Sequence, residues 1–545
     1  MDKHLALVVG AGPVGLTMAA ELARHGVQCR IVDRLSVRSP YCRAIGVTPR
    51  TMEVWDDMGI VSQMIDAGVW LEGMRLIVDG SETKTLTPDY SDLPYGSLGL
   101  PQYSTEAVLE QHLNTFGIAV ERETTLLSLT QTPEGVRVVL QKRDGLTEEA
   151  AFPYVIGCDG AHSSVRKGLQ IAFDGEHYPW EFMLGDVRIE WDMPRGISVR
   201  RIRPRENAAP EMFIAIPLPE RHRYRITMLA PPSESSQTSD SDHGIQSERP
   251  GPTIEQLQAV ADRLFPEKPK LEDLRWSSIF RISMRLASKY REGRVFIAGD
   301  AAHIHPPTGG QGMNTGIQDA YNLAWKLALV GRGAAPASLL DTYERERQPV
   351  GAEVVARTRA QSEGIGRMEG RQNRLVDTQL LVNYRESPLS EGSSRDGDVP
   401  QVGDRAPDCE GLRLRHVHAP VRLFDIFRGT RFVFLLYYRG EMSAAQIHFA
   451  EELAATLQEC WAGLIKIALL WSGEGPEPTL IGLTVYRDEE NVFGKTYVAE
   501  SGSCYAIRPD GHIGWTAVSP KVEDVLAYFE NAVGLKRVAA LAGKK

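Results

Sequence analysis

The chain has 545 residues, of which 42% are hydrophobic and 24% are charged. This composition is that of a globular protein of about three to four domains, and it excludes a disordered, collagenous or coiled-coil chain. Asp and Glu number 71 against 61 Lys and Arg, and the net charge of −10 favours neither a nucleic acid nor an anionic membrane surface as a partner.

The six cysteines are too few for a disulfide scaffold, and none pairs as Cys-x-x-Cys. The sequence therefore indicates neither a zinc ribbon nor a redox dithiol, and no metal site. No apolar run reaches the roughly 18 residues that a membrane span needs. Residues 5–9 predict a strand where a leader peptide would lie. We therefore expect a cytoplasmic protein.

The first predicted unit is a strand at residues 5–9, a helix at 16–25 that Gly26 ends, and a strand at 27–32. A crossover helix between two consecutive strands makes those strands parallel. The N-terminus therefore predicts a β-α-β unit of an α/β fold.

The turn between the first strand and the helix carries Gly10, Gly12, Pro13 and Gly15, in the spacing of a dinucleotide-binding turn. Gly10 permits the tight turn, Gly12 leaves room for a pyrophosphate, and Gly15 lets helix and strand pack closely. Asp33 ends the second strand, where a carboxylate can accept hydrogen bonds from a ribose. A strand, helix, second strand and acid in this order make a chance Gly-rich loop a poor explanation, and we predict a nucleotide site.

Further elements follow in chain order. Strands are predicted at 136–140, 154–157, 182–189, 213–216 and 223–229, a polar loop at 231–252, a helix at 253–265, a strand at 295–298, a helix at 316–329, a charged helical stretch at 339–367 and a linker at 387–407. After the linker a small α/β unit is predicted, with strands at 432–438, 465–471, 505–508 and 512–515 and helices at 444–459 and 522–533. Arg223 and Arg225 share one face of their strand and could bind a substrate carboxylate, but a solvated sheet face is the interpretation we favour.

Two later segments combine glycine and aspartate directly after a predicted strand. Asp159 and Gly160 follow residues 154–157, and the segment from Asp300 to Asn314 follows residues 295–298 with a Pro-Pro pair and three glycines before its helix. A carboxylate there can bind ribityl or ribose hydroxyls, and a glycine-lined helix start lets N–H groups approach a ring and a phosphate. The alternative is a strand-to-helix loop that binds nothing, and for Asp159 this alternative is a loop cap.

In this order the three segments resemble those of the FAD-dependent aromatic hydroxylases with the p-hydroxybenzoate hydroxylase fold, over residues 3 to about 370. Within that family the chain resembles the phenol and polyketide hydroxylase branch. The resemblance implies an α/β fold in which a Rossmann-type FAD domain with a helical extension (residues 1–180 and 285–395) is interleaved with a mixed β-sheet substrate domain (residues 181–284). A thioredoxin-like domain (residues 396–545) would follow, and we expect no redox role for it because it has no Cys-x-x-Cys.

The resemblance also implies which residues hold the cofactor. The glycine turn would bind the pyrophosphate, Asp33 the ribose and Asp300 the ribityl hydroxyls, while the glycine-rich helix start would face the flavin ring. The implied cofactor-binding residues are Gly10, Gly12, Pro13, Gly15, Asp33, Arg34, Arg43, Gln102, Leu126, Asp159, Gly160, Asp300, Pro307, Gly310, Gly312, Met313 and Asn314.

The implied activity is that of an FAD-dependent aromatic-ring monooxygenase. NADPH or NADH would reduce FAD, and O2 would form a flavin C4a-hydroperoxide that hydroxylates a phenolic or polycyclic aromatic substrate. The implied catalytic residues are Arg43 beside a mobile flavin, Pro307 at the ring edge and His305, whose imidazole could deprotonate a phenol. Loop packing is the alternative for His305, and it is the role we expect for His303.

Two other functions stay open on the same fold. One is a Baeyer–Villiger-type flavin monooxygenase, and the other is a flavin-binding protein without turnover. The expected partners are a small aromatic substrate and O2, with no nucleic acid and no membrane, and a homodimer is left open.

Overall fold

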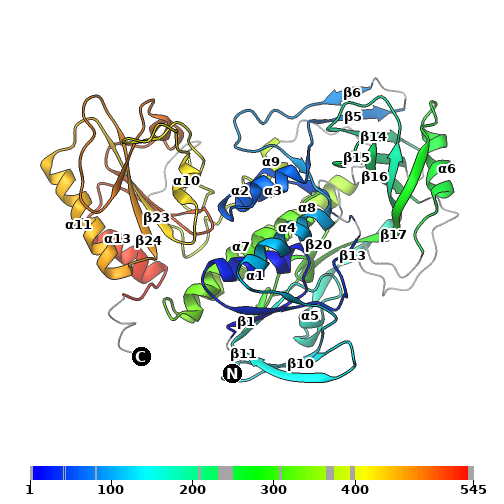
Figure 1. Ribbon diagram of the computed structural model, residues 1–545, viewed down its shortest axis with the longest axis horizontal. Helices are drawn as coiled ribbons and strands as arrows, with labels where there is room; N and C mark the ends of the chain where they lie inside the picture. Colours follow the sequence, from blue (N-terminus) through cyan, green and yellow to red (C-terminus); the bar gives the residue numbers. More distant parts are fainter. Residues whose placement is uncertain are drawn as a thin grey trace.

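The computed structural model describes residues 4–40, 42, 44–79, 83–205, 210–230, 250–305, 310–363, 374–392 and 399–537. Figure 1 shows a C-terminal unit, residues 391–392 and 399–537, beside a larger body that is built from the rest of the described chain. Within the described ranges, no helix is both long enough and apolar enough to cross a bilayer.

A six-stranded sheet forms the centre of the larger body. Its order is β18 (Arg291–Glu292), β19 (Val295–Ile297), β12 (Tyr154–Gly157), β1 (Ala6–Val9), β2 (Cys29–Val32) and β8 (Val120–Glu121), and all neighbours are parallel except β18 and β19. All four residues of β1 and of β12 are buried, as expected for central strands of a parallel sheet. Helix α1 (Pro13–Arg24) starts with its proline in the first turn, and Gly26 follows it at φ +75°. The predicted β-α-β unit is confirmed.

An eight-stranded sheet lies beyond it, in the upper right of Figure 1. Its order is β20 (His303–Ile304), β17 (Leu271–Ala287), β13 (Phe173–Ile189), β16 (Arg223–Leu229), β15 (Glu211–Pro217), β14 (Ile197–Arg203), β5 (Gly73–Val78) and β6 (Lys84–Leu86), antiparallel except for β14 and β5. The strand predicted at 182–189 is the second half of β13, because residues 173–181 are too polar to give an apolar run. Most of the loop predicted at 231–252 lies outside the described residues.

Two three-stranded sheets complete the larger body. One contains β11 (Thr147–Phe152), β10 (Val136–Gln141) and β9 (Thr125–Gln131), and the other contains β3 (Gly46–Val47), β7 (Leu98–Gly99) and β4 (Val69–Trp70). The remaining helices of the body are α2 (Pro49–Asp57), α3 (Val61–Asp66), α4 (Gln102–Thr115), α5 (Ser164–Gly168), α6 (Ile254–Leu264), α7 (Gly312–Gly331), α8 (Asp341–Glu363) and α9 (Arg374–Thr378), with 3-10 turns at Gly299–Ala301 and Ala337–Leu340. The mixed α/β fold with interleaved sheets is confirmed.

The C-terminal unit is built on a seven-stranded sheet. Its order is β21 (Glu391–Gly392), β27 (Ile513–Val518), β26 (Ser503–Ile507), β23 (Phe432–Arg439), β24 (Ile465–Ser472), β25 (Thr484–Arg487) and β22 (Arg413–Leu414). Its helices are α10 (Leu423–Phe427), α11 (Ala444–Trp461), α12 (Val492–Thr496) and α13 (Val522–Ala527), which a π-helical turn at Tyr528–Ala532 extends. Strands β23 and β24 are parallel, because α11 crosses over between them, whereas β26 is antiparallel to β23 and to β27, and the short β21 is parallel to β27.

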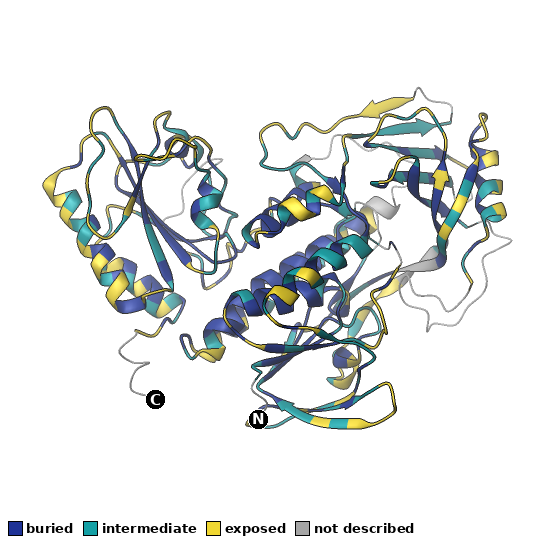
Figure 2. Ribbon diagram, viewed as in Figure 1, coloured by how far each residue is buried: buried dark blue, intermediate teal, exposed yellow. Residues whose placement is uncertain are grey.

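Helix α7 joins the two cores. It is buried over most of its length (Figure 2). Ile317 and Leu323 pack in the core of the parallel sheet, whereas Trp325 and Leu329 pack in the core of the C-terminal unit. Protein covers α7 on both sides, so that its polar side chains, among them Asp319 and Lys326, are buried together with its apolar ones.

Candidate functional site

The three glycines of the turn after β1 differ in the space around them. A methyl group on Gly10, whose φ is +99°, would lie 2.4 Å from the carbonyl oxygen of Cys158, and one on Gly15 would lie 1.9 Å from the carbonyl oxygen of Gly10. A methyl group on Gly12 would meet no heavy atom of the structure within 4 Å. Gly10 and Gly15 are therefore needed by the fold, whereas Gly12 faces open space.

This open space lies at the start of α1. Gly12 is the N-cap of the helix, and among the described side chains none caps it, while Pro13 occupies the first turn. The free N–H groups and the positive dipole end of such a helix start bind anions. This open space at Gly12, called the cradle below, has the room and the N–H donors that a pyrophosphate requires.

Asp33 lies beside this turn. Its carboxylate accepts the N–H groups of Ala11 at 2.6 Å and of Leu35 at 2.8 Å, and its carbonyl accepts the N–H of Thr124 at 2.9 Å. The last bond brings the start of β9 to the turn, where the side chain of Leu126 is buried in the core. Arg34 is exposed next to Asp33.

Asp159 caps a helix. Its Oδ2 accepts the N–H groups of Ser164 at 2.6 Å and Val165 at 3.2 Å at the start of α5, and Gly160 follows at φ +78°. Burial raises the pKa of the Asp159 carboxyl, although these N–H groups act in the opposite direction. This is the geometry of the loop cap, and a cofactor role for Asp159 stays a prediction.

A buried network of charged side chains holds the segment that follows β19, residues 299–303. Asp319 on α7 accepts a hydrogen bond from the ring of His303 at 2.8 Å, from the N–H of Gly299 at 3.0 Å and from Nε of Arg347 on α8 at 2.7 Å. Burial alone would raise the pKa of Asp319, but Arg347 and His303 outweigh it and hold that pKa below its usual value. His303 thus has the packing role expected of it, while the side chain of Asp300 is exposed.

Three segments of the chain converge at Asn314. Its amide donates to the carbonyls of Gly46 at 2.8 Å and Gly310 at 2.7 Å, and its Oδ1 accepts the N–H of Thr48 at 3.0 Å. Gln102 joins from α4, because its Oε1 accepts the N–H of Ala44 at 3.2 Å. The structure therefore brings together residues that lie far apart in the sequence.

Other predicted residues lie around this convergence. Gly312 and Met313 are half-buried at the start of α7, which begins earlier than the predicted residue 316. The His305 ring lies parallel to that of His303, with centroids 6.3 Å apart, and borders Gly312. Arg43 and Pro307 lie outside the described residues.

The eight-stranded sheet also extends to the residues around Asn314. Cys42, Ile45 and Leu218 form an apolar cluster, against which Tyr103 and Ile216 pack. This cluster connects the segment before β3 to the end of β15. The sheet face therefore borders the convergence at Asn314.

The prediction that Arg223 and Arg225 lie on a solvated sheet face is wrong. Arg223 and Arg225 are both buried. Arg223 pairs with Asp273 on β17 and, at 3.4 Å, with Asp186 on β13, and Arg225 stacks on the ring of Trp276 at 5.1 Å. The sequence pattern of β16 alone does not reveal that acids and an aromatic ring from β13, which is next to it, and from β17, which lies beyond β13, cover these cations.

The comparisons with known proteins agree with this geometry. The FAD binding domain family matches residues 3–358. Pentachlorophenol 4-monooxygenase of Sphingobium chlorophenolicum is 33% identical over 536 residues, which cover 94% of this chain and 91% of that protein. The chain belongs to the FAD-dependent aromatic hydroxylases. Anhydrotetracycline monooxygenase of Streptomyces rimosus, 31% identical over 94% of this hydroxylase and 95% of its own length, is a further relative.

Solved structures give the same fold for this hydroxylase. The ternary complex of aklavinone-11 hydroxylase with FAD and aklavinone superimposes with a TM-score of 0.77 at 27% identity, over 98% of this chain and 100% of that one. The anhydrotetracycline hydroxylase from Streptomyces rimosus gives a TM-score of 0.71 at 29% identity, over 97% and 99% of the two chains. The predicted family, enzyme class and mixed α/β fold are confirmed, and a thioredoxin-like C-terminal domain stays a prediction.

Proposed function

We propose that this hydroxylase binds FAD and uses NADPH or NADH and O2 to hydroxylate a phenolic or polycyclic aromatic ring. Two features of the described structure support the proposal. One is the open cradle at Gly12, and the other is the convergence at Asn314, where a glycine-rich helix start faces the eight-stranded sheet.

The chain's residues fit FAD at both ends. The first turn of α1 would hold the pyrophosphate and Asp33 the ribose, with Arg34 and the backbone near Leu126 close to the adenine. Asp300, Arg43 and Gln102 would hold the ribityl chain, while Pro307, Gly310, Gly312, Met313 and Asn314 would border the ring. Bound FAD supplies hydride acceptance from the nicotinamide and activation of O2.

The chain itself would orient the ring of the substrate and keep water away from it. The face of the eight-stranded sheet offers a cluster of buried apolar side chains, namely Phe182, Leu184, Ile202, Met212, Leu229 and Met284. Half-buried Trp180, Ile214 and Trp276 pack against this cluster. Such a surface suits a flat aromatic substrate and favours water exclusion. His305, which follows β20 and borders Gly312 in the first turn of α7, would take a proton from a phenol.

The finer assignments are part of the same proposal. We propose a substrate domain centred on residues 181–284, to which the eight-stranded sheet adds β5, β6 and β20 from outside these bounds. The parallel pair β23–β24 with its crossover helix α11, next to the antiparallel β26 and β27, supports a thioredoxin-like C-terminal domain. All six cysteines are buried and free, which suits a reducing compartment such as the cytoplasm.

The test is a purification followed by two measurements. The absorption spectrum reports bound flavin, and oxidation of NADPH and NADH is followed with a panel of phenols and polycyclic phenols. Substrate-stimulated oxidation with a product 16 mass units heavier, whose NMR spectrum shows a new ring hydroxyl, supports the proposal. A ring-expanded ester instead indicates Baeyer–Villiger oxygenation, and a yellow protein without oxidation indicates flavin binding without turnover.

A further inference from the structure

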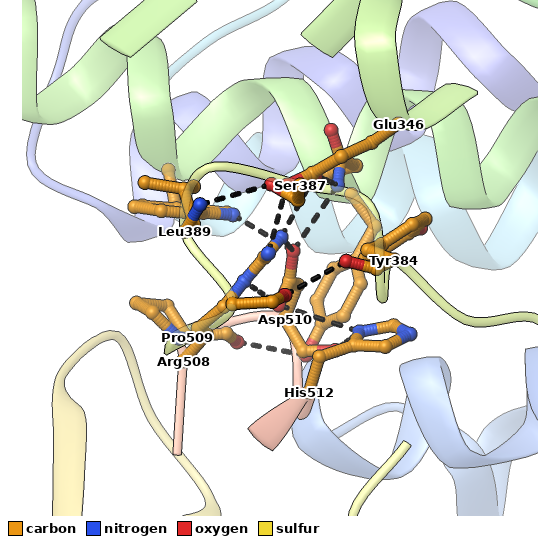
Figure 3. Close-up of polar contacts among 12 residues, drawn as sticks. Glu346, Tyr384, Ser387, Leu389, Arg508, Pro509, Asp510 and His512 are labelled. Carbon is orange, nitrogen blue, oxygen red and sulfur yellow. Dashed lines mark hydrogen bonds and ion pairs between the residues drawn. The ribbon is translucent and has the colours of Figure 1, made fainter. Parts of the chain in front are cut away.

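The turn between β26 and β27 of the C-terminal unit inserts two charged side chains into the larger body (Figure 3). Arg508 donates two hydrogen bonds to Glu346 on α8, at 2.8 and 2.9 Å, and two to Asp510, at 3.0 and 2.5 Å. Asp510 in turn accepts from Asn322 at 3.2 Å and from the indole of Trp325 at 3.1 Å, both on α7. One turn therefore holds α7 and α8 together.

This contact is complete only when both parts are present. Glu346 also accepts from Lys326 at 2.6 Å and from Ser387 at 2.6 Å, and the two cations Arg508 and Lys326 balance the two carboxylates Glu346 and Asp510. All four side chains are almost fully buried. Burial would raise the pKa of Glu346, but Arg508 and Lys326 outweigh it and lower that pKa to about 2. A buried charge without its partner is costly, so docking of the C-terminal unit is part of the fold.

A second contact holds α2. Arg405 pairs with Glu53 at 3.1 Å, and Arg422 and Arg428 both pair with Asp56, at 2.7 and 2.5 Å. The carboxylates of Glu53 and Asp56 are 2% and 4% exposed, so the arginines of the C-terminal unit reach buried acids of the larger body. Figure 1 shows α10 facing α2 at this place.

Both contacts hold elements that carry the residues around Asn314. Helix α2 directly follows β3, whose Gly46 and adjacent Thr48 are hydrogen-bonded to Asn314, and α7 carries Asn314 in its first turn. Arg347, next to Glu346 on α8, donates to the carbonyl of Thr315 at 3.0 Å and to Asp319. Both sides of the convergence at Asn314 are thus anchored in the C-terminal unit.

We propose that the C-terminal unit is a brace that sets the spacing between β3 and the start of α7, with Arg422 and Arg508 as positioning residues for the flavin ring. The inference rests on the proposed function, because the convergence at Asn314 is the proposed ring site. It gives the C-terminal unit a mechanical role in place of a redox role. Small displacements of reacting groups lower rates strongly, and a site open to water would let O2 that has taken two electrons from NAD(P)H leave as hydrogen peroxide instead of hydroxylating the substrate ring.

The test compares Arg422→Gln and R508K with a matched control, Arg413→Gln. Arg413 is also an arginine of the C-terminal unit, but it pairs at 3.4 Å with Glu489 of the same unit, and both side chains are 47% exposed. Two quantities are measured on the full chain. One is hydrogen exchange of the FAD-free protein in peptides covering residues 44–48 and 312–316, and the other is the hydroxylated product formed per NAD(P)H oxidised.

We expect exchange in both peptides to rise at least about tenfold in the two brace variants, and product per NAD(P)H to fall as hydrogen peroxide rises. The control should match the wild type in both quantities. The brace is refuted by wild-type exchange and wild-type product yield in Arg422→Gln, or by equal changes in the control. If R508K does not fold, Arg422→Gln alone decides, because its side chain is 28% exposed and its loss leaves Arg428 on Asp56. A wild-type protein that oxidises no NAD(P)H contradicts the proposed function, whereas the exchange measurement still tests the brace.

Discussion

Gly12→Ala separates the needs of the fold from those of the cofactor. Gly12 has φ −76° and ψ −176°, an extended conformation that alanine adopts without strain. The added methyl group meets no heavy atom of the structure within 4 Å. The FAD-free variant should therefore be as stable as the wild type, or more stable by about 0.4–1 kcal/mol, because alanine lowers the entropy of the unfolded chain.

The cost should appear only when FAD binds. The methyl group occupies the space in which a pyrophosphate would approach the first turn of α1, and a hydrogen bond to a charged group contributes about 1.5–3 kcal/mol. Loss of one such bond weakens FAD binding about 10- to 150-fold, since 1.4 kcal/mol corresponds to a factor of ten. The checks are urea unfolding of the FAD-free protein and fluorescence titration with FAD.

Gly15→Ala is the matched control. Its methyl group would lie 1.9 Å from the carbonyl oxygen of Gly10, so this variant should be destabilised even without FAD. The reasoning is refuted if Gly12→Ala binds FAD as tightly as the wild type, or if it destabilises the FAD-free protein as much as Gly15→Ala does.

Four further outcomes are expected. His303→Gln should lower the free energy of unfolding by about 1–3 kcal/mol, because it disturbs the buried bond to Asp319, and should leave the pH profile of kcat/KM unchanged. His305→Gln should instead keep the melting temperature and lower kcat at least about 100-fold with loss of the acidic limb of the profile; an unchanged limb assigns His305 to loop packing. Asp159→Ala should cost about 1 kcal/mol of unfolding free energy as a lost helix cap, and a large rise in KM for NAD(P)H would contradict the cap role. Glu346 has a pKa lowered from 4.5 to about 2, so its contribution to stability is present above pH 4.5 and lost as the pH falls toward 2; acid unfolding of E346Q should be flatter over that range.

The sequence predicts a site best when the residues of that site lie close together along the chain. The glycine turn, α1 and Asp33 lie within one β-α-β unit, and their positions follow from spacing and apolar periodicity alone. It predicts poorly where polar residues are covered by distant strands. The first half of β13 lacks an apolar run, yet it is paired along β17, and the arginines of β16 are buried by acids from β13 and β17.

The turn at Pro509 shows why the brace could not be predicted. Residues 508–511 have the composition of an exposed hairpin turn, and a hairpin turn connects β26 to β27. Turns usually lie at the surface, and Arg and Asp are almost never fully buried unless they are paired. Here Arg508 and Asp510 are 2% and 1% exposed, and the partner of Arg508, Glu346, lies 162 residues away in the sequence. No local window contains that pair, because the charges are compensated only by docking. Their burial therefore identifies this turn as the contact through which the C-terminal unit acts on α7 and α8.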